Sequence, residues 1–404
     1  MTAPVVSLAK DSDIGHAVKK ALARLNLPNL NGKRILLKPN VGRHITTEKA
    51  INTNPKVVQA VYETLQDQFD ATFFLGDSPI ISTNSKIAFE QSGYEELMNH
   101  PKITYLDLDG PPPLKCEIPK GQLLKRTKLT GYFNDFDYLI SIPVLKMHMH
   151  TGASLSFKNF KGLLYKRTKI ALHHLSAPDV IEPYRSSIPQ IKELDLAIAD
   201  LAHIIKPDLT IIDASYAQEG MGPSGGTPVK MDTIIASQNF LAADLVALHL
   251  VRPEWTLNNV PHLALISKFL PNMPKSLTDI RILPENYGDF QHPIQAPPST
   301  VTISYPNVKL IDVDSCSSCL STIFLFLKNN QEFIETHFTP ENPLVLAIGK
   351  GITEDMFYEP TFFIGNCARK HKKPSYFVEG CAPVQSKLLA LIKTHVETRD
   401  SSPN

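Results

Sequence analysis

Two histidines and a run of lysines follow an apolar stretch that is typical of a buried strand. The stretch FDYLISIPV (136–144) leads to His148 and His150, and then to Lys158 and Lys161. Imidazole groups exchange protons near neutral pH, so either histidine could serve as a general acid or base. Lysine ammonium groups bind phosphate or carboxylate. The segment therefore predicts a site for a small anionic substrate.

Small residues and further cations continue this segment. Gly152 and Ser154 would allow backbone N–H groups to surround an anion. If the strand continues through His150, then His148 and His150 share a face, which would also suit a metal ion. The plainer alternative is a basic surface loop with one or two hydrogen-bonded histidines. The further cations and imidazoles of the segment are Lys166, Arg167, Lys169, His173 and His174.

Four of the five cysteines lie in the last quarter of the chain. Cys316 and Cys319 form a Cys-x-x-Cys pair, and Cys367 and Cys381 follow at uneven spacing. Four thiolates in such a pattern suit a [4Fe–4S] cluster. The alternatives are a zinc site, a redox dithiol at the first pair, or buried and inert thiols. Cys116 lies among prolines, and we expect it to be structural.

Strand-like and helical stretches alternate over the first 250 residues. Near-continuous apolar strands separated by amphipathic helices indicate an α/β fold, with a mostly parallel sheet flanked by helices. The expected strands are 34–40, 71–79, 102–108, 137–145 and 208–215. The expected helices are 55–69, 84–100, 191–205 and 241–251.

Polar residues stand where several of these strands end. Lys38 and Asn40 close one strand, Asp77 and Ser78 close another, and Glu219 lies in a glycine-bearing loop after a third. In open α/β sheets, ligands bind beyond the carboxyl ends of the strands. We therefore expect these five residues to bind the substrate or a cofactor, although an elaborate turn would also explain Glu219.

A proline-rich stretch at 287–300 predicts a domain boundary. It separates an α/β domain at 1–290 from a smaller C-terminal α/β domain at 300–400, which carries the four cysteines. Strands are expected there within 301–314, 343–351, 360–366 and 374–380, with a closing helix at 383–399.

The overall charge is nearly balanced, with 41 Lys and Arg against 40 Asp and Glu. This balance gives no reason to expect a nucleic-acid partner. The most apolar run, 320–328, is too short to span a bilayer, and the first residues lack the apolar core of a signal peptide. We therefore expect a cytoplasmic protein without a membrane span.

The sequence resembles the domain of unknown function 362 family in several motifs. These are ILLKPNVG, NTNPKVVQAV, GDSP, FDYLISIPVLKMHMHTGASLSFKNFKGLL and EGMGPSGGTPVKMDTIIASQNFLAADLVAL. Many members of that family carry iron–sulfur cysteines. The resemblance thus implies an iron–sulfur protein. A cluster bound by the four cysteines could pass electrons to a substrate held at the end of the sheet, so we expect an oxidoreductase-like enzyme with a possible electron-transfer partner.

A weaker similarity is to the nickel-pincer lactate racemase. Its motif contains a histidine, a glycine, a serine, a cofactor-bearing lysine and a second histidine. His148, Gly152, Ser154, Lys158 and His174 stand at similar spacing here. This similarity implies an alternative function, a racemase-like enzyme with a metal cofactor tethered to the lysine. A third alternative is a zinc-binding scaffold without enzymatic activity.

Overall fold

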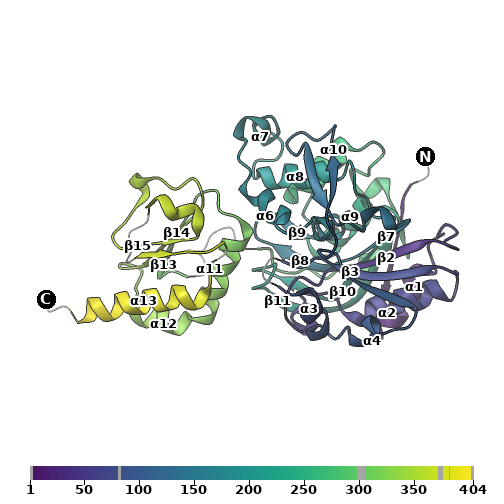
Figure 1. Cartoon of the computed structure of the whole chain (residues 1–404), viewed down its shortest axis with the longest axis horizontal. Coiled ribbons are helices and arrows are strands. Elements are labelled where there is room, and N and C mark those ends of the chain that lie inside the picture. Colours follow the sequence, from purple (N-terminus) through teal and green to yellow (C-terminus); the bar gives the residue numbers. More distant parts are fainter. Residues whose placement is uncertain (1–2, 81–82, 298–304, 372–375, 382, 402–404) are drawn as a thin grey trace. The chain divides into compact units, whose positions relative to one another are not determined.

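The computed structural model describes residues 3–80, 83–297, 305–371, 376–381 and 383–401. The chain forms two compact units. The first comprises Met1–Glu219 and Thr227–Ala296, and the second comprises Gly220–Gly226 and Pro297–Asn404. Both units combine a sheet with helices, which confirms the predicted α/β class (Figure 1).

The first unit is built on a mixed, mostly parallel sheet. Among the described residues its main path runs β12–β1–β11–β10–β7–β2–β3–β4, and β8 pairs with β10 and β9. The pairs from β10 to β4 along this path are parallel, whereas β11 is antiparallel to both neighbours. The strands are β1 (Val5–Lys10), β2 (Arg34–Pro39), β3 (Thr72–Asp77), β4 (Ile103–Asp107), β7 (Tyr138–Ile142), β8 (Val144–His148), β9 (Gly152–Ser154), β10 (Leu209–Glu219), β11 (Thr227–Ser237) and β12 (Arg281–Leu283).

Helices cover both faces of this sheet, which explains why a central strand such as β7 is buried along its whole length. In β2, Leu36 faces one apolar core, while Ile35 and Leu37 face the other. One face carries α1 (Ile14–Leu22), α2 (Pro55–Gln66), α3 (Ser85–Gln91) and α4 (Glu95–Met98). The opposite face carries α5 (Ser156–Asn159), α8 (Glu193–Leu201), α9 (Phe240–Val251) and α10 (Pro261–Phe269).

The predicted strand at 137–145 is two strands, β7 and β8, with Pro143 between them. Proline has no N–H group for a sheet ladder, and the carbonyl of Pro143 accepts the N–H of Asp213 at 2.8 Å. After His148 the chain turns into β9, α5, the 3-10 helix η3 (Phe160–Leu163), α6 (Thr168–Ala171), the 3-10 helix η4 (Leu172–His174) and α7 (Pro178–Arg185). A separate ribbon pairs β5 (Leu114–Glu117) with β6 (Arg126–Leu129).

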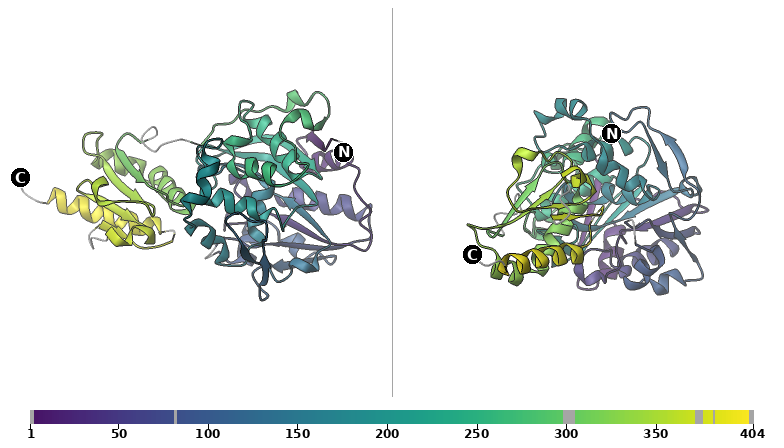
Figure 2. Two further views of the ribbon diagram at one scale, coloured as in Figure 1. Left: turned by 90° about the horizontal axis from the view of Figure 1, so that it is seen from above. Right: turned by 60° about the vertical axis from the view of Figure 1, so that its left-hand side comes forward.

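The second unit has a parallel sheet in the order β13–β14–β15–β16. Its strands are β13 (Val308–Asp312), β14 (Leu344–Ile348), β15 (Thr361–Ile364) and β16 (Phe377–Val378). Its helices are α11 (Ser317–Asn329), α12 (Gln331–His337) and α13 (Gln385–Asp400), and α11 packs against α13 (Figure 2). The expected strand residues 301–304 and 374–375, and residues 298–300 of the expected boundary, lie outside the described residues.

Candidate functional site

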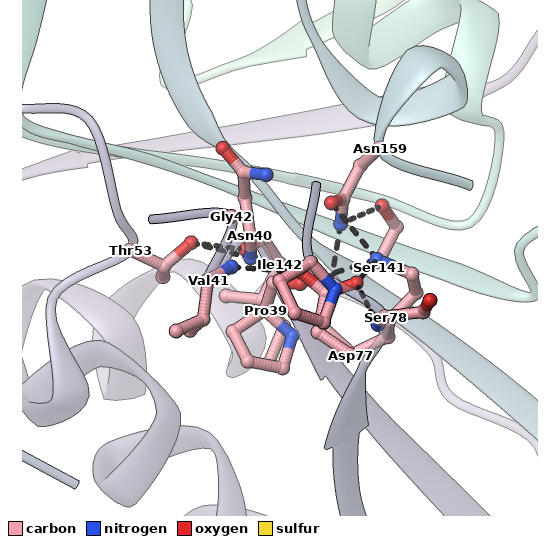
Figure 3. A network of polar contacts seen from close by, with 12 residues as sticks. Pro39, Asn40, Val41, Gly42, Thr53, Asp77, Ser78, Ser141, Ile142 and Asn159 are labelled. Atoms are coloured by element: carbon pink, nitrogen blue, oxygen red, sulfur yellow. Dashed lines mark hydrogen bonds and ion pairs between the residues drawn. The ribbon is translucent and has the colours of Figure 1, made fainter. Parts of the chain in front are cut away.

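A buried ion pair joins the carboxyl ends of β2 and β3. Lys38 Nζ lies 2.7 Å from Asp77 Oδ1, and the two side chains are 0% and 3% exposed. Lys38 also donates to Asn159 Oδ1 at 3.1 Å and to the Pro39 carbonyl at 3.3 Å. Figure 3 shows Asp77, Ser141 and Asn159 brought together at this point. Three acceptors thus use the three ammonium protons of Lys38. Lys38 and Asp77, which were predicted to bind a ligand, therefore support the structure around the site.

Asn40 contributes to the site by fixing a lysine that the sequence analysis missed. Lys146 lies in β8 and donates to the Asn40 side chain at 2.5 Å and to the Ile51 carbonyl at 2.8 Å. Burial, followed by the charge of Arg43, lowers the pKa of Lys146 to about 7. A lysine inside an otherwise apolar strand was the available signal, since such a residue is seldom buried without a role.

The prediction that His148 and His150 share a strand face is wrong, because β8 ends at His148. The ring nitrogen Nδ1 of His148 accepts the N–H groups of His150 at 3.2 Å and Thr151 at 3.3 Å. Burial, followed by the charge of Lys158, lowers the pKa of His148 well below its ordinary value. We infer a neutral ring with its proton on Nε2, which makes His148 a hydrogen-bond donor toward any ligand.

Lys158 and Lys161 lie three residues apart on the continuous turns of α5 and η3, so both point to the same side. Lys158 Nζ donates to Ser154 Oγ at 3.0 Å. Burial lowers the pKa of Lys158 well below its ordinary value, and the charges of Lys161 and Lys146 add to this effect. The predicted residues Ser154, Lys158 and Lys161 are thus brought together.

Lys161 contacts His173, the neighbour of the predicted His174. The distance from Lys161 Nζ to His173 Nε2 is 3.0 Å. His174 is exposed, so the structure brings His173 to the lysines in its place. Burial lowers the pKa of His173 well below its ordinary value. Because Nε2 accepts from the Lys161 ammonium group, Nδ1 carries the proton, and it has no hydrogen-bond partner in the described part of the chain.

A buried carboxylate and imidazole complete the cluster. Asp195 and His262 are both 0% exposed, and Asp195 Oδ1 lies 3.7 Å from His262 Nδ1. Asp195 Oδ2 accepts the N–H of Lys192 at 3.0 Å, and Lys192 Nζ lies 3.3 Å from His150 Nδ1. The negative charge of Asp195 partly offsets the lowering of the Lys158 pKa. The lysines and imidazoles nevertheless outnumber this carboxylate.

The lysine-bearing turn is held in place by Asp244, a residue of α9. Its carboxylate accepts the N–H groups of Ser156 at 2.9 Å and Phe157 at 3.4 Å, which caps α5. Burial raises the pKa of Asp244 to about 8.

Three predicted binding residues have other partners. Ser78 donates to Asp109 and accepts from Lys169. Glu219 accepts the N–H of Gln295 at 2.8 Å. Gly152 has φ +74°, and a Cβ there would lie 2.2 Å from the Asn259 carbonyl oxygen, so close packing requires this glycine. The central candidates are therefore Lys146, His148, His150, Lys158, Lys161 and His173.

The four cysteines of the second unit follow the carboxyl ends of strands in its parallel sheet. Cys316 and Cys319 follow β13, Cys367 follows β15, and Cys381 follows β16. The hydrogen bond with Cys316, then burial, then the charges of Cys316, Cys367 and Cys381 raise the pKa of Cys319 far above its ordinary value. The four sulfur atoms are therefore close enough to interact electrostatically. Within the described residues, no three His, Cys, Asp or Glu side chains are arranged as a metal site.

Comparison with known proteins gives a family and one curated relative. The family model described as "Domain of unknown function (DUF362)" matches residues 35–249. The "Thylakoid-associated protein sll1697" of Synechocystis sp. (strain ATCC 27184 / PCC 6803 / Kazusa) is 27% identical over 215 residues, which cover 53% of this chain and 62% of that protein. In the described part of the chain, no helix combines the length and apolarity needed to cross a membrane.

Two solved structures are similar at low identity. A protein from Thermotoga maritima has a TM-score of 0.35 and 13% identity, covering 64% of this chain and 60% of that one. The lactate racemase apoprotein from Thermoanaerobacterium thermosaccharolyticum has a TM-score of 0.39 and 13% identity, covering 63% and 58%. This chain thus spans less than two thirds of the length of each of these three proteins.

Proposed function

The chain belongs to the family described as Domain of unknown function (DUF362), and from this premise we propose that its first unit is an enzyme domain for a small anionic substrate. One observation carries the proposal: the charges of Lys146, Lys158 and Lys161 all lower the pKa of the buried His148, those of Lys158 and Lys161 also lower the pKa of His173, and Asp195 is the carboxylate whose charge acts on Lys158. Clustered positive charge in a buried place is costly unless an anion compensates it. A bound phosphate or carboxylate would remove that cost.

Some residues of this cluster would bind the anion, and others would transfer protons. Lys161 would supply an ammonium group, and His148 and His173 would supply neutral N–H donors. Lys158 would be the base or nucleophile, because burial and the charge of Lys161 lower its pKa and so increase the neutral fraction of the amine.

Thermal unfolding in the presence of lactate, pyruvate or inorganic phosphate tests the site, with sodium chloride at equal ionic strength as the reference. We expect at least one of these anions to raise Tm in the wild type, and the rise to be lost in Lys161→Met. The exposed Lys128, in the ribbon strand β6, provides the matched control Lys128→Met, which should keep the rise. If none of the three anions raises Tm, the proposal fails.

We propose in addition that the second unit binds a [4Fe–4S] cluster through Cys316, Cys319, Cys367 and Cys381. Two observations support this donor set: the four cysteines follow the carboxyl ends of strands in one parallel sheet, and the charges of Cys316, Cys367 and Cys381 act on Cys319. The same donor set would suit zinc as well. A bound cluster would supply electron transfer, and a redox partner would follow from it. A cytoplasmic location belongs to this proposal, because free thiols persist in a reducing compartment.

Anaerobic reconstitution with iron and sulfide separates the cluster from zinc. We expect a brown protein with absorbance near about 400 nm and a paramagnetic signal after reduction. Cys319→Ser should lose both, whereas Cys116→Ser, in β5 of the first unit, should keep both. A colourless protein that holds one zinc ion would reject the cluster.

The racemase-like alternative makes a different prediction. A cofactor tethered to Lys158 would appear as extra intact mass in protein purified from its native host, and Lys158→Met would remove it. An unmodified native mass would reject this alternative.

A further inference from the structure

The Lys158 amine has fewer hydrogen-bond partners among the described residues than the buried amines of Lys38 and Lys146. Lys38 has three acceptors, one of them the carboxylate of Asp77. Lys146 has two oxygen acceptors. Among the described residues, the Lys158 amine has one hydrogen-bond partner, the hydroxyl of Ser154 at 3.0 Å. A hydroxyl can donate as well as accept, so it also tolerates a neutral amine.

We propose that Lys158 is a nucleophile that forms an imine with a small carbonyl compound carrying an anionic group. This inference rests on the proposed anion site and names the substrate class that the site would take. The amine attacks the carbonyl carbon, a C–N bond forms, and the C–O bond then breaks. The two amine protons and the carbonyl oxygen leave as one molecule of water, so no oxidant or reductant is needed.

The surroundings of Lys158 favour this reaction. An amine attacks a carbonyl only in its neutral form, and burial together with the charges of Lys161 and Lys146 lowers the pKa of Lys158. Lys161, three residues further along the same helical turns, offers an ammonium group for the anionic end of the substrate. His173 Nδ1 is a buried donor that lacks a partner among the described residues, and it could hydrogen bond to the substrate.

The rest of the cluster keeps Lys158 in place without binding it directly. Asp244 caps the first turn of α5, two residues before Lys158, with hydrogen bonds of 2.9 Å and 3.4 Å. Asn159, the next residue, is fixed to Lys38 and to Ser141 Oγ at 3.1 Å. The backbone on both sides of the lysine is therefore rigidly held, as a nucleophile requires.

Reductive trapping tests the inference. The full-length protein is treated briefly with cyanoborohydride and either pyruvate or glycolaldehyde phosphate, and the modified lysines are located by peptide mass mapping. With pyruvate we expect an added mass equal to pyruvic acid less one oxygen atom at Lys158. We expect at least tenfold greater modification of Lys158 than of the exposed Lys128, and protection by unreactive lactate or phosphate. The two carbonyl compounds show whether the anionic group is a carboxylate or a phosphate.

Two variants test whether trapping is specific to Lys158. Lys158→Met should abolish trapping, and Lys128→Met should leave it unchanged. If lactate and pyruvate both raise Tm but Lys158 is trapped no faster than Lys128, the imine is rejected while the anion site survives. If none of the anions raises Tm and Lys158 is not trapped, both proposals fall. Trapping at Lys158 that lactate or phosphate cannot block would also overturn the inference, because the reaction would then be unspecific.

Discussion

Gly162 lies directly against Asp77, so closely that a methyl group has no room between them. A Cβ built on Gly162 would be 2.2 Å from Asp77 Oδ1 and 2.6 Å from Lys38 Nζ. The glycine thus lets η3, which carries Lys161, approach the buried ion pair that ends β2 and β3. The fold of the lysine turn and the ends of the sheet are coupled through this contact.

Gly162→Ala should therefore lower the free energy of unfolding by about 1–3 kcal/mol, the usual cost of overpacking a well-packed site. Urea unfolding measures this. Gly288→Ala is the matched control, because a Cβ at Gly288 would meet no atom within 4 Å. The control should stay within about 0.5 kcal/mol of the wild type. Equal stability of the two variants would contradict the coupling.

Removal of one partner of the Lys38–Asp77 pair should be more harmful than removal of both charges. Lys38→Met leaves the Asp77 carboxylate buried without its cation, which typically costs about 3–5 kcal/mol. Lys38→Met with Asp77→Asn removes the uncompensated charge, so the double variant should recover part of that loss. A double-mutant cycle in urea measures the coupling energy. A double variant whose loss equals the sum of the single losses would show that the two residues are not coupled.

The stability of the first unit should depend on pH through Lys146. Burial lowers the pKa of Lys146 from 10.5 to about 7 in the folded chain. Between these values the unfolded chain binds more protons than the folded one, so this residue makes stability rise with pH from about 7 to about 10. Below the lower value both states are protonated, and the contribution no longer changes.

Lys146→Met should remove this rise. The unfolding free energy of the wild type, relative to the variant, should increase by about 1 kcal/mol per pH unit between pH ~7.5 and ~9.5. Urea unfolding across this range measures the difference. The unfolding free energy of Lys128→Met should have the same pH dependence as that of the wild type. If Lys146→Met also has that pH dependence, the Lys146 pKa is not lowered.

Anion binding should be accompanied by proton uptake. Burial, followed by the charge of Lys161, lowers the pKa of Lys158 in the free protein, and an anion that binds without reacting with this amine favours its ammonium form. Affinity should therefore fall as pH rises above the lowered pKa of Lys158. Titration calorimetry in buffers with different ionisation enthalpies measures the protons exchanged. Proton release on binding would contradict the arrangement of the cluster.

The sequence predicted β2, β3, β4, β7 and the first part of β10, because the buried strands of a parallel sheet are mostly apolar. The stretch 34–40 became β2 for this reason. The sequence did not predict β1, β9 or β12. The same signal could not show that Pro143 divides the stretch 137–145 into two strands, or that β8 ends at His148. An apolar stretch reports burial, whereas the end of a strand depends on its pairing partners, here β9 and β10.

The sequence indicated most residue types of the candidate site, but it did not indicate which of these residues contact one another. Lys38 and Asp77 were identified by their position at strand ends, but their ion pair depends on the parallel register of β2 and β3. Lys146 is anchored by the carbonyl of Ile51, which is 95 residues away in the chain. The choice between His173 and His174 depends on the direction of one short turn, η4, which no spacing rule determines.

The second unit offers a test that leaves every cysteine in place. Gly365 has φ +90°, and a Cβ on it would lie 3.1 Å from Cys319 Sγ. Gly365→Ala would therefore strain the backbone and press on this sulfur atom, whereas Gly288→Ala has open space around it. If the four thiols hold a cluster, Gly365→Ala should take up at least several-fold less iron and sulfide on anaerobic reconstitution, and Gly288→Ala should match the wild type. Far-ultraviolet circular dichroism shows whether the variant remains folded. Full cluster content in folded Gly365→Ala would mean that Cys319 is not a ligand.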